Sequence, residues 1–530
     1  MLLFGMNTPK ITDEALAKLL HENEMLRKER DELQASRNNL EEQVRLLRSI
    51  LYGKSSEKKI VDGPTPEQPF LPFDEADTST AVPGITEATC IVTAHARQKP
   101  GRKSLPANLP RVDVEFDLPE DQKFASCGCP LTRIGAEITE RLDIVPAKIQ
   151  VLRYIRHKYA PNCSCEIPEN APGEVRIASL PPQIIPQGIV TPGLLAHVMT
   201  SKYIDAIPLY RQEQQFMRLG LDINRGTLAS WVRLTAEACQ PIFELLQKEV
   251  RAGPVIYMDE TRVQVMKEPG RANTTQSYMW VCRGGLPDRP AVTFRYYPTR
   301  SGSVAEELLA GYRGYLHTDG YAGYEAVGER DGIRHLACWA HVRRKFVEVV
   351  KGTKGQHKAG VAQRVIDLIG KLYAIEDQAR EQGLISDDWV AKRTSEARPV
   401  LDTMKQLLDE QRGKAPPKSL LGKAIAYASN LWPRLIVYLE NAFLRLDNNL
   451  AENAIRPFAV GRKNWLFSGS PRGADASATL YSIIETAKAN NIEPYAYLRL
   501  LFNEISSART EADLHSLLPQ YLDRSRLAMS

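Results

Sequence analysis

Two stretches, Pro254-Val-Ile-Tyr-Met-Asp-Glu-Thr261 and Gly314-Tyr-Leu-His-Thr-Asp-Gly-Tyr321, decide the fold of this chain. Each contains a short apolar run rich in β-branched and aromatic residues, which is typical of a buried strand. The first run leads to Asp259 and the second to Asp319, so each strand is expected to place a carboxylate at its end. Aspartates also cap turns after strands without any further role, and that interpretation stays open at this point.

The segments around these two runs predict the topology. Strands are expected at residues 277–282, 291–297 and 333–338, and helices at residues 303–310, at 322–327 and from Trp339 onward. The resulting order of strands and helices is that of a ribonuclease-H-like fold, in which the first and fourth strands are neighbours. Asp259 and Asp319 would then converge. Two close carboxylates need cations, and Mg²⁺ prefers oxygen ligands together with substrate phosphates.

A third acidic residue follows much later, in Leu446-Asp-Asn-Asn-Leu-Ala-Glu-Asn-Ala-Ile-Arg-Pro457. Asp447 or Asn448 is expected to cap a helix that carries Glu452, and this carboxylate would complete a metal site. Arg456, Arg462 and Lys463 are candidates for holding DNA phosphates beside it. The alternative is that Glu452 only pairs with Arg456 at i, i+4 on a solvated helix face.

Composition describes a globular protein of several domains. The chain has 530 residues, and Lys plus Arg exceed Asp plus Glu by 69 − 64 = 5. This mild excess means that a nucleic-acid surface has to come from local clusters. The N-terminal residues lack a signal-peptide core, and no apolar run is long enough to span a bilayer. We therefore expect a cytoplasmic protein, nucleoid-associated when bound to DNA, whose eight cysteines are reduced.

Leucines at seven-residue intervals predict a coiled coil near the N-terminus. Leu19, Leu26, Leu33, Leu40 and Leu47 fit position d of consecutive heptads. Polar residues at the matching a positions, Asn23 among them, predict a weak zipper for self-association. The alternative is a single amphipathic helix that lies on the protein's own core.

The next two segments suggest a linker and a metal module. Residues 53–110 have a composition that cannot bury a core, and Lys99, Arg102 and Lys103 at its end can contact DNA phosphates or simply form a solvated linker. Two cysteine pairs follow with 163 − 129 − 1 = 33 residues between them, which suggests a four-thiolate structural Zn²⁺ site. The ligands would be Cys127, Cys129, Cys163 and Cys165. Only one residue separates the cysteines of each pair, so reduced cysteines without metal remain the alternative.

Residues 208–235 fit a helix-turn-helix. A first helix at 209–217, a turn containing Gly220 and a second helix capped by Asn224 would place Arg225 and Thr227 nearest the DNA bases. An αα-hairpin that binds nothing has a similar pattern. The charge-rich stretch from about 356 to 438 indicates a helical insertion without chemistry, and His341 just before it is expected to pack or hydrogen-bond rather than to bind metal.

With these motifs in place, nearly the whole chain resembles the DDE transposases of the insertion-sequence-66 type. The motifs that carry the resemblance are Leu51-Tyr-Gly-Lys-Ser-Ser-Glu57, Lys99-Pro-Gly-Arg-Lys103, Tyr257-Met-Asp-Glu-Thr261, His317-Thr-Asp-Gly-Tyr-Ala-Gly-Tyr324, Cys338-Trp-Ala-His341, Asp447-Asn-Asn-Leu-Ala-Glu-Asn-Ala-Ile-Arg-Pro457 and Gly461-Arg-Lys-Asn-Trp-Leu-Phe467. The resemblance implies a catalytic triad at Asp259, Asp319 and Glu452, with two Mg²⁺ ions. The family's zinc segment usually has two residues between paired cysteines, so the pairs here depart from it. Small accessory transposition proteins are further implied partners.

The expected architecture is an α/β multidomain protein. It comprises a leucine zipper at 10–52, a flexible basic linker at 53–110, a zinc-finger-like module at 111–175, a helix-turn-helix region at 180–250, a ribonuclease-H-like catalytic domain at 251–475 with a helical insertion at about 351–445, and a C-terminal helical domain at 476–530. The expected function is metal-dependent cleavage of the element's terminal repeats and strand transfer into target DNA. Two alternatives stay open: a catalytically silent, sequence-specific DNA-binding regulator derived from a transposase, and a nuclease that cuts structured DNA without strand transfer.

Overall fold

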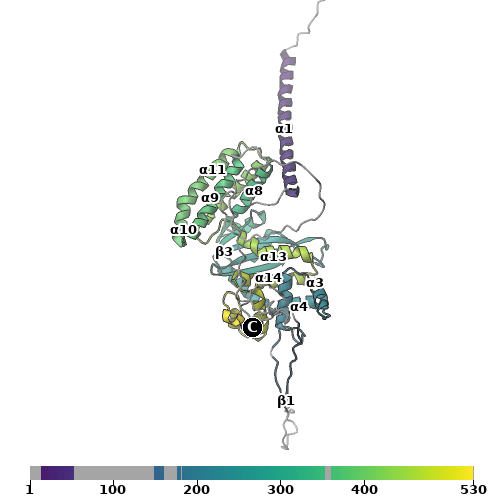
Figure 1. Cartoon of the computed structure of the whole chain (residues 1–530). Helices are drawn as coiled ribbons and strands as arrows, with labels where there is room; N and C mark the ends of the chain where they lie inside the picture. Colours follow the sequence, from purple (N-terminus) through teal and green to yellow (C-terminus); the bar gives the residue numbers. More distant parts are fainter. Residues whose placement is uncertain (1–12, 53–148, 160–175, 181, 353–359, 529–530) are drawn as a thin grey trace, which may run out of the picture. The chain divides into compact units, whose positions relative to one another are not determined.

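The computed structural model describes residues 13–52, 149–159, 176–180, 182–352 and 360–528 (Figure 1). The predicted contacts of Lys99, Arg102 and Lys103, and the thiolate site of Cys127, Cys129, Cys163 and Cys165, lie outside the described residues. All described helices and strands belong to the compact unit formed by Met1–Glu57 and Arg156–Ser530.

The N-terminal helix α1 spans Asp13–Tyr52, as the leucine spacing predicts. Its leucines at positions 26, 33, 40 and 47 are 58%, 65%, 58% and 56% exposed. These four leucines are therefore largely exposed in the single chain. Self-association through the row stays a prediction.

A mixed sheet with strand order β5-β4-β3-β6-β7 lies at the centre of the described unit. Its strands are β3 (Val255–Val265), β4 (Gln276–Leu286), β5 (Arg289–Tyr297), β6 (Gly314–Thr318) and β7 (Ile333–Ala337), and β8 (Phe467–Ser468) pairs with the end of β3. The pairs β3–β4 and β4–β5 are antiparallel, whereas β3–β6 and β6–β7 are parallel. The predicted neighbour relationship between the first and fourth strands of this segment is confirmed.

One detail of the prediction is wrong: Asp259 lies in the middle of an 11-residue strand, not at its end. Beyond Asp259, β3 continues because it pairs with β4 as far as Gln264 and then with β8. Val263 and Val265 are buried along this extension, as alternation in a strand requires. The paired register with β6 ends at Tyr257, so Asp259 still lies where the parallel part of the sheet ends.

The helices between the strands follow the predicted order. They are α6 (Gly302–Leu308), the short η3 (Ala322–Tyr324) with α7 (Glu325–Gly328), and α8 (Trp339–Gly352). The helices expected between about residues 356 and 438 are present and gather as a group drawn in green in Figure 1. It contains α9 (Val361–Glu381), α10 (Ser386–Lys392), a π-helical turn η4 (Arg393–Ala397), α11 (Arg398–Arg412), α12 (Leu420–Leu435) and η5 (Val437–Glu440).

Two helices after the insertion complete the sheet's surroundings. Helix α13 spans Asn449–Trp465, and α14 spans Pro471–Ala489, so the proposed domain boundary at residue 475 falls within α14. Side chains of α14 satisfy the free edge of β5: Ser482 Oγ accepts the Phe294 N–H at 2.7 Å, and Thr486 Oγ1 accepts the Val292 N–H at 3.0 Å. A covered edge cannot template pairing with another chain. The chain then ends with α15 (Pro494–Glu504), η6 (Ile505–Ser507), α16 (Glu511–Ser516) and η7 (Arg524–Ala528).

The helices that precede the sheet include the two helices predicted between residues 208 and 235. The helices are α2 (Pro192–Tyr203), α3 (Leu209–Arg218), α4 (Arg225–Ala238) and α5 (Gln240–Ala252), preceded by the short strands β1 (Lys158–Tyr159) and β2 (Arg176–Ile177). Asn224 caps α4, as predicted, because its Oδ1 accepts the Thr227 N–H at 2.9 Å. Across the described helices, none combines the length and the hydropathy that a bilayer span requires.

Candidate active site

The register of the parallel strands brings Asp259 and Asp319 together. Tyr257 of β3 pairs with His317 of β6, so the residues two positions further on are Asp259, within β3, and Asp319, directly after the end of β6. Successive side chains alternate between the two faces of a sheet. The two aspartates therefore share one edge and one face of the sheet, as the sequence predicts.

Glu452 reaches the same edge from the first turn of α13. Asn448, the residue just before α13, anchors this turn to the sheet. Its Nδ2 donates to the Met258 carbonyl at 2.8 Å, and its backbone N–H donates to Cys338 Sγ at 3.2 Å. Asn448 occupies the predicted N-cap position, but its side chain is used to hold β3 rather than to cap the helix. Asp447 takes part in the turn, because its Oδ1 accepts the Asn449 N–H at 3.2 Å.

The electrostatics of Asp259 show that the three carboxylates act on one another. Burial, the neighbouring Glu260, Asp319 and Glu452 together raise the pKa of Asp259 from 3.8 to about 8. Burial disfavours the charged form, and like charges nearby add to this effect. A carboxylate held in this way is protonated at neutral pH unless a cation compensates its charge.

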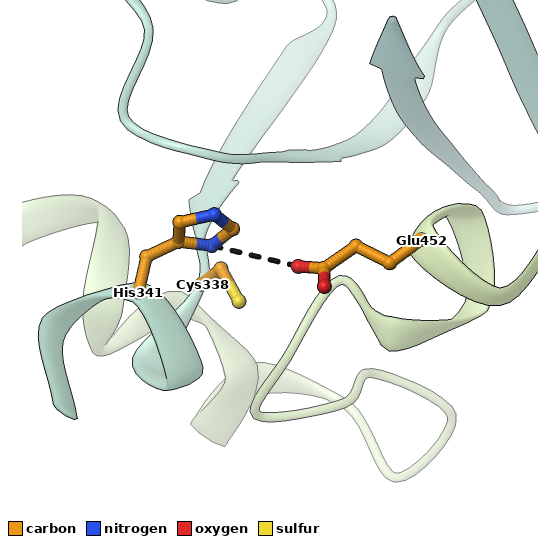
Figure 2. Close-up of side chains that lie close together, drawn as sticks. All are labelled: Cys338, His341 and Glu452. Carbon is orange, nitrogen blue, oxygen red and sulfur yellow. Dashed lines mark ion pairs between the residues drawn. The ribbon is translucent and has the colours of Figure 1, made fainter. Parts of the chain in front are cut away.

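Glu452 has basic neighbours that differ from the predicted one. Its Oε1 lies 3.6 Å from His341 Nδ1, and its Oε2 lies 4.0 Å from Arg344 (Figure 2). Among the described ion pairs of Glu452, neither involves Arg456, whose side chain is exposed. The solvated i, i+4 pair is therefore not formed. Oε1 is buried and has no hydrogen-bond partner within the part of the chain that the structure describes.

Glu260 is a buried acid that the sequence analysis did not single out. It follows Asp259 directly, so its side chain points to the opposite face of the sheet. There it accepts hydrogen bonds from Arg300 and from the Tyr324 hydroxyl, and its side chain is 1% exposed. The sequence offered one signal for Glu260, which is a charged residue within an apolar run predicted to form a strand. Protein donors already engage its oxygens, so Glu260 supports the site from the opposite face of the sheet.

The carboxylate set fits a hard divalent cation. Asp259, Asp319 and Glu452 offer only oxygen ligands, which is the preference of Mg²⁺. The buried Glu452 oxygen without a partner and the raised pKa of Asp259 are both relieved when a cation binds. Three residues from β3, the end of β6 and α13 thus supply a donor set suited to Mg²⁺.

The residues predicted to contact DNA differ in exposure and in hydrogen bonding. Arg225, Arg456 and Lys463 are exposed, while Thr227 is half-buried and its hydroxyl lies 3.3 Å from the capping Asn224 Oδ1. Arg462 is not a free phosphate ligand here. Its guanidinium donates to Thr261 Oγ1 at 3.1 Å and to the Arg262 carbonyl, so it fastens α13 to β3.

Comparison with models of protein families decides the class of the protein. The model described as "Transposase IS66 family" matches residues 187–476, which is more than half of the chain and includes all three carboxylates. The chain belongs to the IS66 transposase family. Three other models match it: "Transposase C of IS166 homeodomain" at residues 39–114, "zinc-finger binding domain of transposase IS66" at 125–166, and "IS66 C-terminal element" at 482–520.

Full-length relatives support this assignment. The uncharacterized protein y4jD of Sinorhizobium fredii (strain NBRC 101917 / NGR234) is 32% identical over 500 residues, which cover 91% of this chain and 94% of the relative. The uncharacterized protein y4qI of the same strain is 30% identical over 503 residues, which cover 91% of this chain and 88% of the relative. The similarity therefore extends well beyond the catalytic segment.

Membership in the IS66 family makes the protein a DDE transposase, which implies a phosphoryl-transfer enzyme that binds DNA. The DDE domain suggests divalent metal ions. The zinc-finger match spans Cys127, Cys129, Cys163 and Cys165, so it suggests zinc despite the short spacing within each cysteine pair. The match at residues 39–114 is to a leucine-zipper model of the same family, and it agrees with self-association.

Proposed function

We propose that this IS66 transposase binds the terminal repeats of its insertion sequence, cleaves the DNA there and joins the freed ends to target DNA. Asp259, Asp319 and Glu452 are the catalytic residues. The observation that carries this proposal is the convergence of three acids from distant segments, where burial and Glu260, with smaller contributions from Asp319 and Glu452, raise the pKa of Asp259. The strand order supports a ribonuclease-H-like assignment for the catalytic domain.

The three carboxylates would hold two Mg²⁺ ions, which supply charge neutralisation and activation of the attacking oxygen in an in-line displacement at phosphorus. Asp259 is fixed by its place within a paired strand, and Glu452 is fixed because Asn448 ties the start of α13 to Met258. Such preorganisation is the protein's main contribution to phosphoryl transfer, and no covalent enzyme intermediate is required.

Positive charge near the site suits a DNA substrate. Arg344 lies beside Glu452, and Arg456 and Lys463 project from α13 as exposed cations. We assign Arg456 and Lys463, with Arg225 at the start of α4, to phosphate or base contacts, while Thr227 shapes the cap of the same helix. Lys99, Arg102 and Lys103 are proposed to extend the contact along the DNA backbone.

The remaining domain assignments follow the same scheme. The zipper at 10–52 is proposed to bring two protomers together, as pairing of two DNA ends requires, and the module at 111–175 to hold a structural Zn²⁺ ion. Residues 180–250 recognise DNA, residues 251–475 carry the chemistry, and residues 476–530 complete the packing. Small accessory proteins encoded beside the transposase are proposed partners of the assembled complex.

A cleavage and strand-transfer assay tests the proposal. Purified full-length protein is incubated with DNA carrying the ends of its element, in Mg²⁺ or in EDTA. Joined products that require Mg²⁺ are expected, with a loss of at least about 100-fold in Asp259→Asn and Glu452→Gln. Asp331→Asn is the matched control, because Asp331 is an exposed acid of the same domain, paired only with Arg313 among the described residues.

The products discriminate among the three functions that the sequence left open. Cut but unjoined DNA would indicate a nuclease. Retarded but intact DNA, with accessory proteins present, would indicate a regulator derived from a transposase. Wild-type activity of the Asp259→Asn variant would remove this residue from the site.

A further inference from the structure

A second group of potential metal ligands lies beside the carboxylates and includes a sulfur atom. Cys338 follows the end of β7, His341 lies in the first turn of α8, and Glu452 lies in the first turn of α13. One ligand atom from each of them lies within 4.8 Å of the other two. Figure 2 shows the three side chains turned toward one another from separate elements.

The distances within this group suit a shared ion better than direct contacts. His341 Nδ1 and Glu452 Oε1 are 3.6 Å apart, which is too long for a hydrogen bond. Nitrogen and oxygen ligands of a tetrahedral zinc ion lie about 2.0–2.1 Å from the metal, which places them roughly 3.3 Å from each other. Both atoms are buried, and neither has a hydrogen-bond partner within the described residues. Buried polar atoms without partners are uncommon, and a bound ion would satisfy both.

We propose that Cys338, His341 and Glu452 form a binding site for a thiophilic divalent ion of the zinc class. Thiolate, imidazole and carboxylate are the ligand types of zinc, whereas Mg²⁺ does not favour sulfur or nitrogen. The Cys338 sulfur already accepts the Asn448 backbone N–H at 3.2 Å, an interaction that orients the ligand from outside the site. Three protein ligands leave the fourth position of the ion open to water or to a DNA oxygen.

The site has a regulatory consequence, which rests on the proposed function. Glu452 belongs both to this group and to the catalytic carboxylates, so an ion held by Cys338 and His341 competes for its oxygens. Sites with nitrogen and sulfur ligands bind Zn²⁺ more tightly than Mg²⁺. Zinc at this site therefore inhibits the Mg²⁺-dependent reaction by withdrawing Glu452 from Asp259 and Asp319.

Metal stoichiometry tests the site without relying on activity. Full-length protein and its variants are equilibrated with Zn²⁺ in excess Mg²⁺, dialysed, and analysed for zinc per chain. Wild type is expected to retain one zinc more than Cys338→Ser and His341→Gln. Cys282→Ser is the matched control, because Cys282 is another buried free cysteine, on β4, outside the group. The four-cysteine module contributes equally to all four proteins.

Cobalt gives a second readout of the same site. Co²⁺ bound to a thiolate has a sulfur-to-metal absorption band, whose intensity should fall in Cys338→Ser but not in Cys282→Ser. His341→Gln keeps the test valid if the serine variant fails to fold, because His341 is only partly buried. Equal zinc content in wild type, His341→Gln and Cys338→Ser would overturn the proposal.

The regulatory consequence is tested separately by titrating zinc into the Mg²⁺-dependent cleavage reaction. With each rate normalised to that protein's own zinc-free rate, at least a tenfold inhibition is expected for wild type and less than twofold for His341→Gln. Zinc binding with unchanged cleavage would refute the inhibition and leave the site intact. Absence of cleavage in zinc-free Mg²⁺ buffer, with the accessory proteins present, would refute the proposed function, and the stoichiometry would still decide whether the zinc site exists.

Discussion

Arg393 and Glu376 form a buried two-pronged ion pair in the helical insertion, with Nε–Oε1 at 2.8 Å and Nη2–Oε2 at 2.7 Å. The same guanidinium donates to the carbonyls of Tyr438, Asn441 and Leu444, at 2.5, 2.6 and 2.7 Å. These carbonyls belong to the segment that leads directly to Asn448 and Glu452. The helical insertion therefore fixes the segment that leads into α13. The sequence had suggested an insertion without chemistry.

Replacing Arg393 by Met is expected to destabilise the protein by about 3–5 kcal/mol, because Glu376 and three carbonyls would remain buried without their partner. Chemical denaturation measures the loss. The matched control is Lys405→Met, which removes an exposed i, i+4 pair with Asp409 and should cost less than about 1 kcal/mol. Equal losses of stability in the two variants would show that the buried cluster stabilises the protein no more than an exposed ion pair.

The sequence was sufficient for the order of the elements because apolar periodicity, turn residues and caps are local. The sequence was not sufficient where contacts between distant parts of the chain decide how long a strand is or what a side chain binds. Asp259 was expected at a strand end, since the sequence does not reveal that β3 pairs with β4 as far as Gln264 and that β8, about 200 residues later, pairs with its last two residues. The cluster of Arg393 and Glu376 was missed for the same reason, because the carbonyl partners of Arg393 lie 45 to 51 residues further along the chain. His341 became a candidate ligand only when α13 brought Glu452 to it.

The stability of the metal-free protein is expected to fall as pH rises from about 4 to about 8. Asp259 has an ordinary pKa of 3.8 in the unfolded chain and about 8 in the folded one. Across this interval the folded state binds more protons than the unfolded state, so rising pH favours unfolding. Asp259→Asn should weaken this dependence and, in EDTA at pH 8, should be more stable than wild type by at least about 1 kcal/mol. Urea denaturation at several pH values measures both effects, with Asp331→Asn as a control that follows wild type.

Substitutions of the adjacent acids Glu260 and Asp259 are expected to affect different properties of the protein. Glu260→Gln weakens the interactions with Arg300 and Tyr324 and should cost about 1–3 kcal/mol of stability. Because its side chain faces away from the catalytic group, the folded variant should retain Mg²⁺-dependent cleavage within about tenfold of wild type. Asp259→Asn should show the reverse pattern, with cleavage lost and folding kept. A Glu260→Gln protein that is stable but inactive would place Glu260 among the metal ligands.

Arg462 and Lys463 are neighbours on α13 with separable roles. Arg462→Met should reduce stability by about 1–2 kcal/mol, because the hydrogen bonds to Thr261 and Arg262 that join α13 to β3 are lost. Lys463→Met should leave stability unchanged and weaken DNA binding, with the slope of log affinity against log salt reduced by about 1. Denaturation and salt-dependent binding assays measure the two effects. A lowered salt slope for Arg462→Met alone would reverse the assignment.

The exposed leucine row of α1 predicts that self-association can be removed without unfolding the rest of the chain. Leu26 and Leu33 are more than half exposed, so charged replacements meet no buried neighbour in one protomer. In a coiled coil the same positions insert into the partner helix, and a charge there opposes assembly. The double variant Leu26→Glu/Leu33→Glu should therefore sediment as a monomer at concentrations where wild type is a dimer, with the same midpoint of chemical denaturation for the catalytic domain. Met25→Glu with Lys28→Glu is the matched control for two charged substitutions in the same helix, outside the leucine row. Dimerisation retained by the Leu26→Glu/Leu33→Glu variant would move the self-association surface away from α1.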